Sequence, residues 1–300
     1  LAIFRFAAGI PAANPASVAS CSSVGETLVT PPGSEELIAA ALAADNISYE
    51  QSVLYRAYAL YDHPDLPEEF RSPVVDYHAA MALFLEVGEN HDSLSPELLD
   101  DLEPFLARPN DPVSIINNPP QRAGALVAAA AEPWVGEPAA GGMLRVWVQY
   151  SPVSEAALRY YAEEATRVWN ALPGIFRYGL PDTPNQPSAA VNPNSAIDIY
   201  FVDVGELDPR KAWCDVAPQP PRCVYNNSGG AYTGYENASA PQVSPSYLMV
   251  DASISGPDLT STIAHELVHA GQHAYDIWEP FWLKDATAEW GAMRVTQKLG

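Results

Sequence analysis

The chain has 300 residues, of which 37 are acidic and 15 are lysine or arginine, so its formal net charge at pH 7 is −22. This acidity disfavours a nucleic-acid partner, which needs a basic surface, and it disfavours binding to anionic membranes. The sequence contains no continuous apolar run of about 18 residues or more, so we expect no transmembrane segment.

Residues 1–33 have the composition of a leader followed by a linker. Apolar and small side chains dominate residues 1–19, which suggests the remnant of a signal segment and therefore a secreted, extracellular protein. Cys21 follows Val18-Ala19-Ser20, which loosely resembles the cleavage box of bacterial lipoproteins. A lipid anchor at Cys21 on the cell surface is therefore an alternative expectation.

Residues 34–122 are predicted to be helical. Apolar positions recur there at the three- and four-residue spacing that places side chains on one face of a helix. Four helical segments are expected, at residues 34–42, 48–61, 76–87 and 96–106. The segments 108–112 and 117–120 are rich in proline and asparagine, and we predict that they are linkers.

Residues 123–300 are predicted to contain both strands and helices, which gives an α+β fold class. Apolar and polar side chains alternate over 144–150, which predicts a strand. Two further strands are expected at 197–204 and 247–250. Residues 158–172 carry apolar side chains at helical spacing, and the Pro173-Gly174 pair is expected to end that helix.

The chain has three cysteines, of which Cys214 and Cys223 bracket a short proline-rich segment. A disulfide between them would close a small loop. The signs of export favour this pairing over free thiols, because disulfides persist in oxidising compartments.

The segment 265–269 reads His-Glu-Leu-Val-His, and its flanks are compatible with a helix. On a helix, His265 and His269 lie on the same face, so their two imidazoles can bind one Zn²⁺. Glu266 lies beside them, where its carboxylate can reach a metal-bound water. The spacing therefore predicts a zinc site in which Glu266 is the catalytic base.

A catalytic zinc site needs a third protein ligand. Residues 282–299 are predicted to form a second helix, on which Asp285 and Glu289 lie one turn apart on one face. Both carboxylates are candidates. The metzincin pattern H-E-x-x-H-x-x-G-x-x-H is excluded, because Gln272 and Tyr275 occupy the positions of its glycine and its third histidine.

These motifs resemble those of the gluzincin metallopeptidases, the thermolysin-like clan. In that clan the second helix carries W-L-x-E-G-x-A-E or N-E-x-x-x-D, whose first carboxylate binds zinc and whose second orients a ligand histidine. The resemblance implies Asp285 as the third ligand and Glu289 as the orienting residue. The chain departs from the clan in having Asp at 285 and Ala286 where glycine is common. Counted from His269, Glu289 matches the thermolysin spacing better, so it remains an alternative ligand.

The chain is also similar to a group of bacterial secreted metalloproteases, whose zinc helix reads A-H-E-x-x-H-x-x-Q and whose next helix carries E-[GA]-T-A-x-W. The corresponding segments are 264–272 and 285–290, and Asp285 takes the place of the glutamate. The similarity implies a zincin-like catalytic lobe at 123–300, a mixed sheet with an HExxH helix and a ligand helix. It also implies that the helical region 34–122 is propeptide-like, and that a C-terminal lobe is missing from this chain.

The resemblance implies a zinc-dependent endopeptidase that acts on proteins or peptides. A water activated by Zn²⁺ would attack the peptide carbonyl, with Glu266 as the general base. Two other classes remain open. One is a catalytically silent zincin-fold binding protein, which Asp285 in place of glutamate favours. The other is a surface lipoprotein with an accidental motif, which would bind no metal and carry lipid at Cys21.

Overall fold

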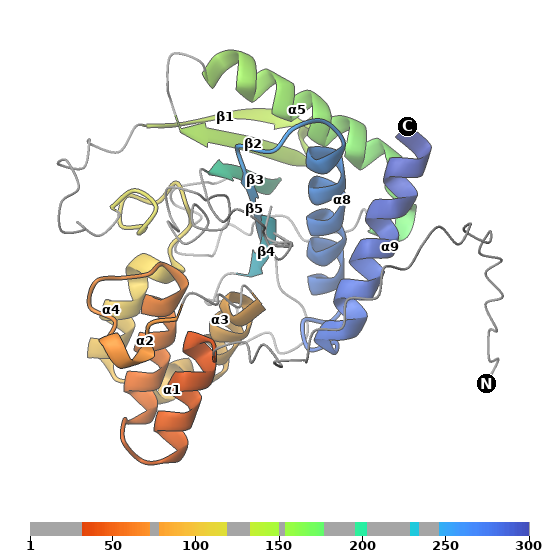
Figure 1. Cartoon of the computed structure of the whole chain (residues 1–300). Coiled ribbons are helices and arrows are strands. Elements are labelled where there is room, and N and C mark those ends of the chain that lie inside the picture. Colours follow the sequence, from red (N-terminus) through yellow and green to blue (C-terminus); the bar gives the residue numbers. More distant parts are fainter. Residues whose placement is uncertain are drawn as a thin grey trace, which may run out of the picture. The chain divides into compact units, whose positions relative to one another are not determined.

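The described strands form one mixed sheet of five strands (Figure 1). The structure is a computed structural model that describes residues 32–72, 78–118, 133–149, 154–176, 196–202, 229–233 and 246–299, all within one unit that spans residues 32–300. In spatial order the strands are β1 (Trp134–Ala139), β2 (Leu144–Gln149), β3 (Ile197–Val202), β5 (Ser246–Asp251) and β4 (Gly229–Thr233). Strands β2, β3 and β5 are parallel, whereas β1 and β4 run antiparallel to their neighbours.

The sequence predicted the three central strands but not the two edge strands. The predictions over 144–150, 197–204 and 247–250 are confirmed by β2, β3 and β5. Strand β1 contains Gly136 and Pro138, and β4 begins with Gly229 and Gly230. Glycine and proline are depleted in strands, and proline is tolerated mainly at sheet edges, so these segments carry little strand signal.

One face of the sheet is covered by three helices, α5 (Ser154–Ala171), α8 (Gly256–His273) and α9 (Phe281–Leu299). Figure 1 shows α8 and α9 side by side, with α5 beside β1 and β2. All three helices were predicted, and the apolar positions expected on α5 are buried there. Together with the sheet they form one apolar core, and the α+β fold class is thus confirmed.

The N-terminal region contains four α-helices among its described residues. They are α1 (Ser34–Ala43), α2 (Tyr49–Leu60), α3 (His78–Asn90) and α4 (Pro96–Leu106), which confirms the four predicted helical segments. Helices α2 and α4 begin at serine caps, because the hydroxyl of Ser48 accepts from the Gln51 amide and that of Ser95 from the Leu98 amide.

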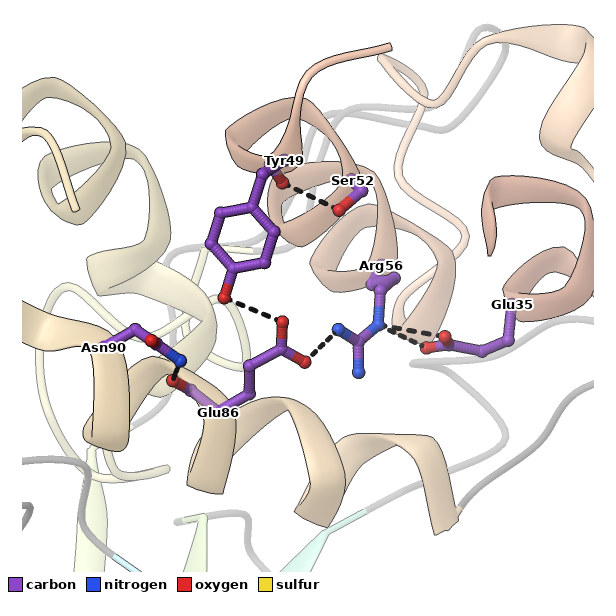
Figure 2. A network of polar contacts seen from close by, with 6 residues as sticks. All are labelled: Glu35, Tyr49, Ser52, Arg56, Glu86 and Asn90. Atoms are coloured by element: carbon purple, nitrogen blue, oxygen red, sulfur yellow. Dashed lines mark hydrogen bonds and ion pairs between the residues drawn. The ribbon is translucent and has the colours of Figure 1, made fainter. Parts of the chain in front are cut away.

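Charged side chains join the first three of these helices (Figure 2). The Arg56 guanidinium on α2 donates to the Glu35 carboxylate on α1, with Nε–Oε2 at 2.9 Å, and also to the Glu86 carboxylate on α3. The Tyr49 hydroxyl donates to Glu86 at 2.9 Å. Burial, reinforced by Glu86, raises the pKa of Tyr49 to about 12, so this phenol stays a donor at neutral pH. The network fixes how α1, α2 and α3 pack on one another.

The helical region shares a second apolar core with the other face of the sheet. Apolar side chains of α2, α3 and α4 pack there with Trp147, Tyr200 and Tyr247. The segment after α4, which was predicted as a linker, makes polar contacts with the same face. Asn110 accepts from the Tyr200 hydroxyl at 2.9 Å, and Asn117 accepts from the Trp134 indole nitrogen at 2.9 Å.

A buried ion pair lies at the centre of this interface. Arg108, which follows α4, donates from Nη1 to Oδ2 of Asp198 on β3 at 3.0 Å. The side chains are 3% and 0% exposed. The second carboxylate oxygen of Asp198 accepts from the Trp147 indole nitrogen at 2.7 Å, and the guanidinium lies 5.1 Å from the Tyr247 ring centroid. Both charges therefore depend on partners across the interface.

Candidate metal centre

Helix α8 presents the HExxH segment at the boundary between core and solvent. Pro257 occupies the first turn and Asp258 provides an acidic side chain there, both of which favour a helix start. Ile263, Leu267 and Val268 are buried against the sheet. This apolar face fixes the rotation of α8, and as a result the two motif histidines lie half-buried beside α9.

The tight packing of α8 and α9 brings the predicted residues together. A side chain at Gly291 would meet a Val268 methyl group at 2.5 Å, so glycine is needed for this approach. Within the part of the chain that the structure describes, His265, His269 and Asp285 each offer one ligand atom, and these atoms lie within 4.8 Å of one another. Two of them come from α8 and the third from the first half of α9.

The distances in this group are compatible with one small cation. The Nε2 atoms of His265 and His269 are 3.0 Å apart, and His265 Nε2 is 3.5 Å from Oδ1 of Asp285. A tetrahedral zinc ion with Zn–N bonds of ~2.0–2.1 Å separates two ligand nitrogens by roughly 3.3 Å. The residues present therefore fit zinc in number, type and spacing.

Gln272 orients the second histidine. Its amide nitrogen donates to the carbonyl oxygen of Lys284 at 3.0 Å, which turns its amide oxygen toward Nδ1 of His269, 2.8 Å away. Because an amide oxygen only accepts, Nδ1 must carry the proton, and Nε2 of His269 then presents its lone pair to the ligand group. In the sequence, Gln272 stands out only as a position of the zinc-helix patterns. The i, i+3 spacing of a histidine and an amide on one helix was the signal that could have revealed its role.

Replacing Gln272 by leucine should weaken zinc binding about 10–100-fold, the usual effect of losing a partner that orients a ligand. The leucine keeps the volume of the buried side chain but cannot accept the proton of His269. Zinc affinity measured by competition with a chelating dye checks this expectation. A glutamate at position 272 should restore part of the affinity, because it still accepts from Nδ1. Unchanged affinity in the leucine variant would contradict the assigned role.

The two candidate carboxylates occupy different places. Asp285 lies near Nε2 of His265, within the ligand group. Glu289 lies near the opposite ring nitrogen, with Oε2 3.6 Å from Nδ1 of His265, and its side chain is 74% exposed. This distance is too long for a direct hydrogen bond. Burial lowers the pKa of His265, against the opposing effect of Asp285 and Glu289, and this favours the neutral imidazole that a metal requires.

Glu266 and His273 lie deeper in the fold than the ligand group. The Glu266 residue is only 7% exposed. His273, one turn beyond His269, is buried, and its Nδ1 lies 2.8 Å from the hydroxyl of Ser246 on β5. Burial lowers the pKa of His273 well below its ordinary value, so the ring is neutral and packs in the interior.

Several predictions concern residues outside the described ranges. Cys21, Cys214 and Cys223 all lie there, and with them the lipid anchor and the disulfide. Of the helices that the structure describes, none is both long and apolar enough to cross a membrane.

Any assignment of function rests on the geometry of this site, because comparisons with known proteins found no match. No family model, no curated protein and no solved structure matches this chain.

Proposed function

We propose that this protein is a zinc-dependent endopeptidase of the gluzincin type, with His265, His269 and Asp285 as the metal ligands. The observation that carries the proposal is the convergence of these three side chains within 4.8 Å. Two neutral nitrogens and one carboxylate are a ligand set typical of catalytic zinc, which keeps its fourth position for water or substrate.

The arrangement of helices and strands supports the same proposal. Helix α8 packs on a mixed sheet, and the antiparallel edge strand β4 lies next to α8. The order of strand, helix, strands, motif helix and ligand helix is the one that the gluzincin resemblance implies. A zincin-like lobe is therefore the proposed architecture of residues 123–300, and an extended peptide that adds to the sheet edge is its proposed substrate.

The residues of the chain would divide the chemistry as follows. When bound, zinc supplies a Lewis acid that polarises a peptide carbonyl and acidifies a water. Glu266 accepts the proton of the attacking water on its carboxylate and then delivers it to the nitrogen of the leaving amine. Gln272 holds His269 in the tautomer whose Nε2 carries a lone pair instead of a proton, and Glu289 lies where it can bias the orientation of His265.

Zinc content and casein hydrolysis, measured together on three proteins, test the proposal. Wild type should contain about one zinc per chain, as expected for a catalytic site of three protein ligands. Asp285→Ala should lose the metal and the activity. Glu289→Ala, the matched control one turn away, should retain the metal with an affinity about 10–100-fold weaker at most.

The other outcomes are equally informative. Loss of zinc chiefly in Glu289→Ala would make Glu289 the ligand. Zinc without hydrolysis in wild type would favour a catalytically silent binding protein. A refolded, zinc-supplemented wild type that binds no metal would refute the metallopeptidase proposal.

A further inference from the structure

Helix α9 carries an apolar residue on the same face as the candidate ligand. Trp282, Asp285, Glu289 and Met293 are spaced by three and four residues, so they form one stripe along the helix. The neighbouring face of α9 is buried in the core through Ala288, Ala292 and Val295.

The first residue of this stripe is unusually exposed for its size. Trp282 is 70% exposed, the largest exposed fraction among the large apolar side chains that the structure describes, and Met293 at the far end is 46% exposed. A single exposed apolar side chain is ordinary on a protein surface. What distinguishes Trp282 is its place, three residues before Asp285 on the face that carries the ligand group.

The turn of α9 that carries Trp282 is held in place by the hydrogen bonds of Lys284. Lys284 is 5% exposed, and its ammonium group donates to the carbonyl oxygen of Ile277 at 3.0 Å. Its own carbonyl accepts from the Gln272 amide, which also contacts His269. The backbone around Trp282 is therefore tied to the residue that orients a ligand histidine. A side chain on such a rigid element can contact a substrate at low cost in conformational entropy.

We propose that Trp282 is a specificity-determining residue that packs against the substrate side chain next to the scissile bond. This inference rests on the proposed peptidase function. Side chains three residues apart on a helix have Cβ atoms about 5–6 Å apart, and consecutive substrate Cα atoms are ~3.8 Å apart. A peptide whose carbonyl lies at the ligand group thus places a neighbouring side chain within reach of the indole ring.

Charge narrows the class of side chain that Trp282 would accept. Asp276, Glu279 and Glu289 lie on α9 or just before it, whereas the nearby Lys284 is buried. An acidic substrate side chain would be repelled by these carboxylates. An aromatic or large aliphatic side chain would instead cover the exposed indole and remove apolar surface from water. The substrate class is therefore a peptide with a bulky apolar residue beside the cleaved bond.

Binding of peptide hydroxamates to the zinc-loaded protein tests this inference without requiring turnover. Three ligands should be compared by calorimetry, differing only in whether phenylalanine, alanine or glutamate flanks the hydroxamate. Wild type should bind the phenylalanine ligand about 10-fold or more tighter than the alanine ligand, the scale of discrimination by an apolar contact. The glutamate ligand should bind most weakly.

Variants of the two exposed tryptophans on α9 make the test specific. Trp282→Ala should bind the phenylalanine and alanine ligands equally, and Trp282→Phe should retain part of the preference. Trp290→Ala is the matched control, because Trp290 is 44% exposed but stands on a different face of α9, against Phe176. It should keep the full preference, and zinc content should be unchanged in all three variants.

The outcomes separate this inference from the proposed function. A preference that survives in Trp282→Ala would overturn the role of Trp282 while leaving the peptidase proposal intact. If Trp282→Ala loses the preference but wild type hydrolyses no peptide, Trp282 has the proposed role in binding and the protein is not a peptidase. Absence of hydroxamate binding by zinc-loaded wild type would overturn both.

Discussion

Replacing Glu266 by glutamine should lower peptide hydrolysis by about 10²–10⁴-fold while leaving the zinc content unchanged. Glutamine has the size and shape of glutamate but cannot accept a proton at neutral pH, so the water would lose its base. Position 266 is largely buried on α8, and an isosteric change therefore preserves the packing around it. Casein hydrolysis and zinc content measured on the same sample check the expectation.

A second substitution separates chemistry from folding in this test. His265→Ala should lose activity together with zinc, because it removes one of the three ligand atoms in the group. Glu266→Gln should differ from it by keeping the metal and the far-UV circular dichroism of wild type. Full activity in Glu266→Gln would show that this carboxylate is not the base, and the proposed mechanism would fail.

Replacing Arg108 by methionine should lower the free energy of unfolding by about 3–5 kcal/mol, the usual cost of leaving one partner of a buried ion pair alone. The substitution retains apolar bulk but removes the guanidinium from Asp198, which is 0% exposed. A loss of this size is a large fraction of the total stability of an ordinary folded domain. Urea-induced unfolding followed by circular dichroism measures it.

The double variant Arg108→Met with Asp198→Asn is the control, and it also covers the case in which the single variant fails to fold. The asparagine oxygen can still accept from the Trp147 indole, but the side chain no longer carries a charge that needs a partner. We expect the double variant to be more stable than Arg108→Met alone. If the free energy of unfolding of Arg108→Met lies within about 1 kcal/mol of the wild-type value, the ion pair does not stabilise the contact between the helical region and the sheet.

The position of this ion pair bears on the proposed propeptide role of residues 34–122. The helical region and the segment after α4 cover Trp147, Tyr200 and Asp198 on one face of the sheet. The ligand group lies on α8 and α9, which pack on the opposite face. Dissociation of the helical region would break the Arg108–Asp198 pair and expose Trp147, Tyr200 and Tyr247 to water, and exposing this much apolar surface is unfavourable. A cleaved helical region is therefore expected to remain bound.

The sequence by itself determined the helices, the central strands and the candidate chemistry. Helical spacing on α5, α8 and α9 and strand composition in β2, β3 and β5 are local signals, and the structure confirms these elements. The spacing of His265 and His269 on one helix is local as well, so their shared face followed from the sequence alone. The edge strands β1 and β4 were not predicted because their glycine and proline residues have low strand propensity. Pairing with the neighbouring strands of the sheet outweighs this local preference.

Only the tertiary structure decided which groups meet across elements. By sequence spacing, Asp285 and Glu289 lie on the same face of α9 and were both candidate ligands. The close approach of α9 to α8 at Gly291 places Asp285 near Nε2 of His265 and Glu289 near Nδ1 of the same ring. The pairing of Arg108 with Asp198 spans 90 residues and was invisible for the same reason. Local patterns fix the face on which a side chain lies, whereas the partner it meets depends on how packed cores set the elements against one another.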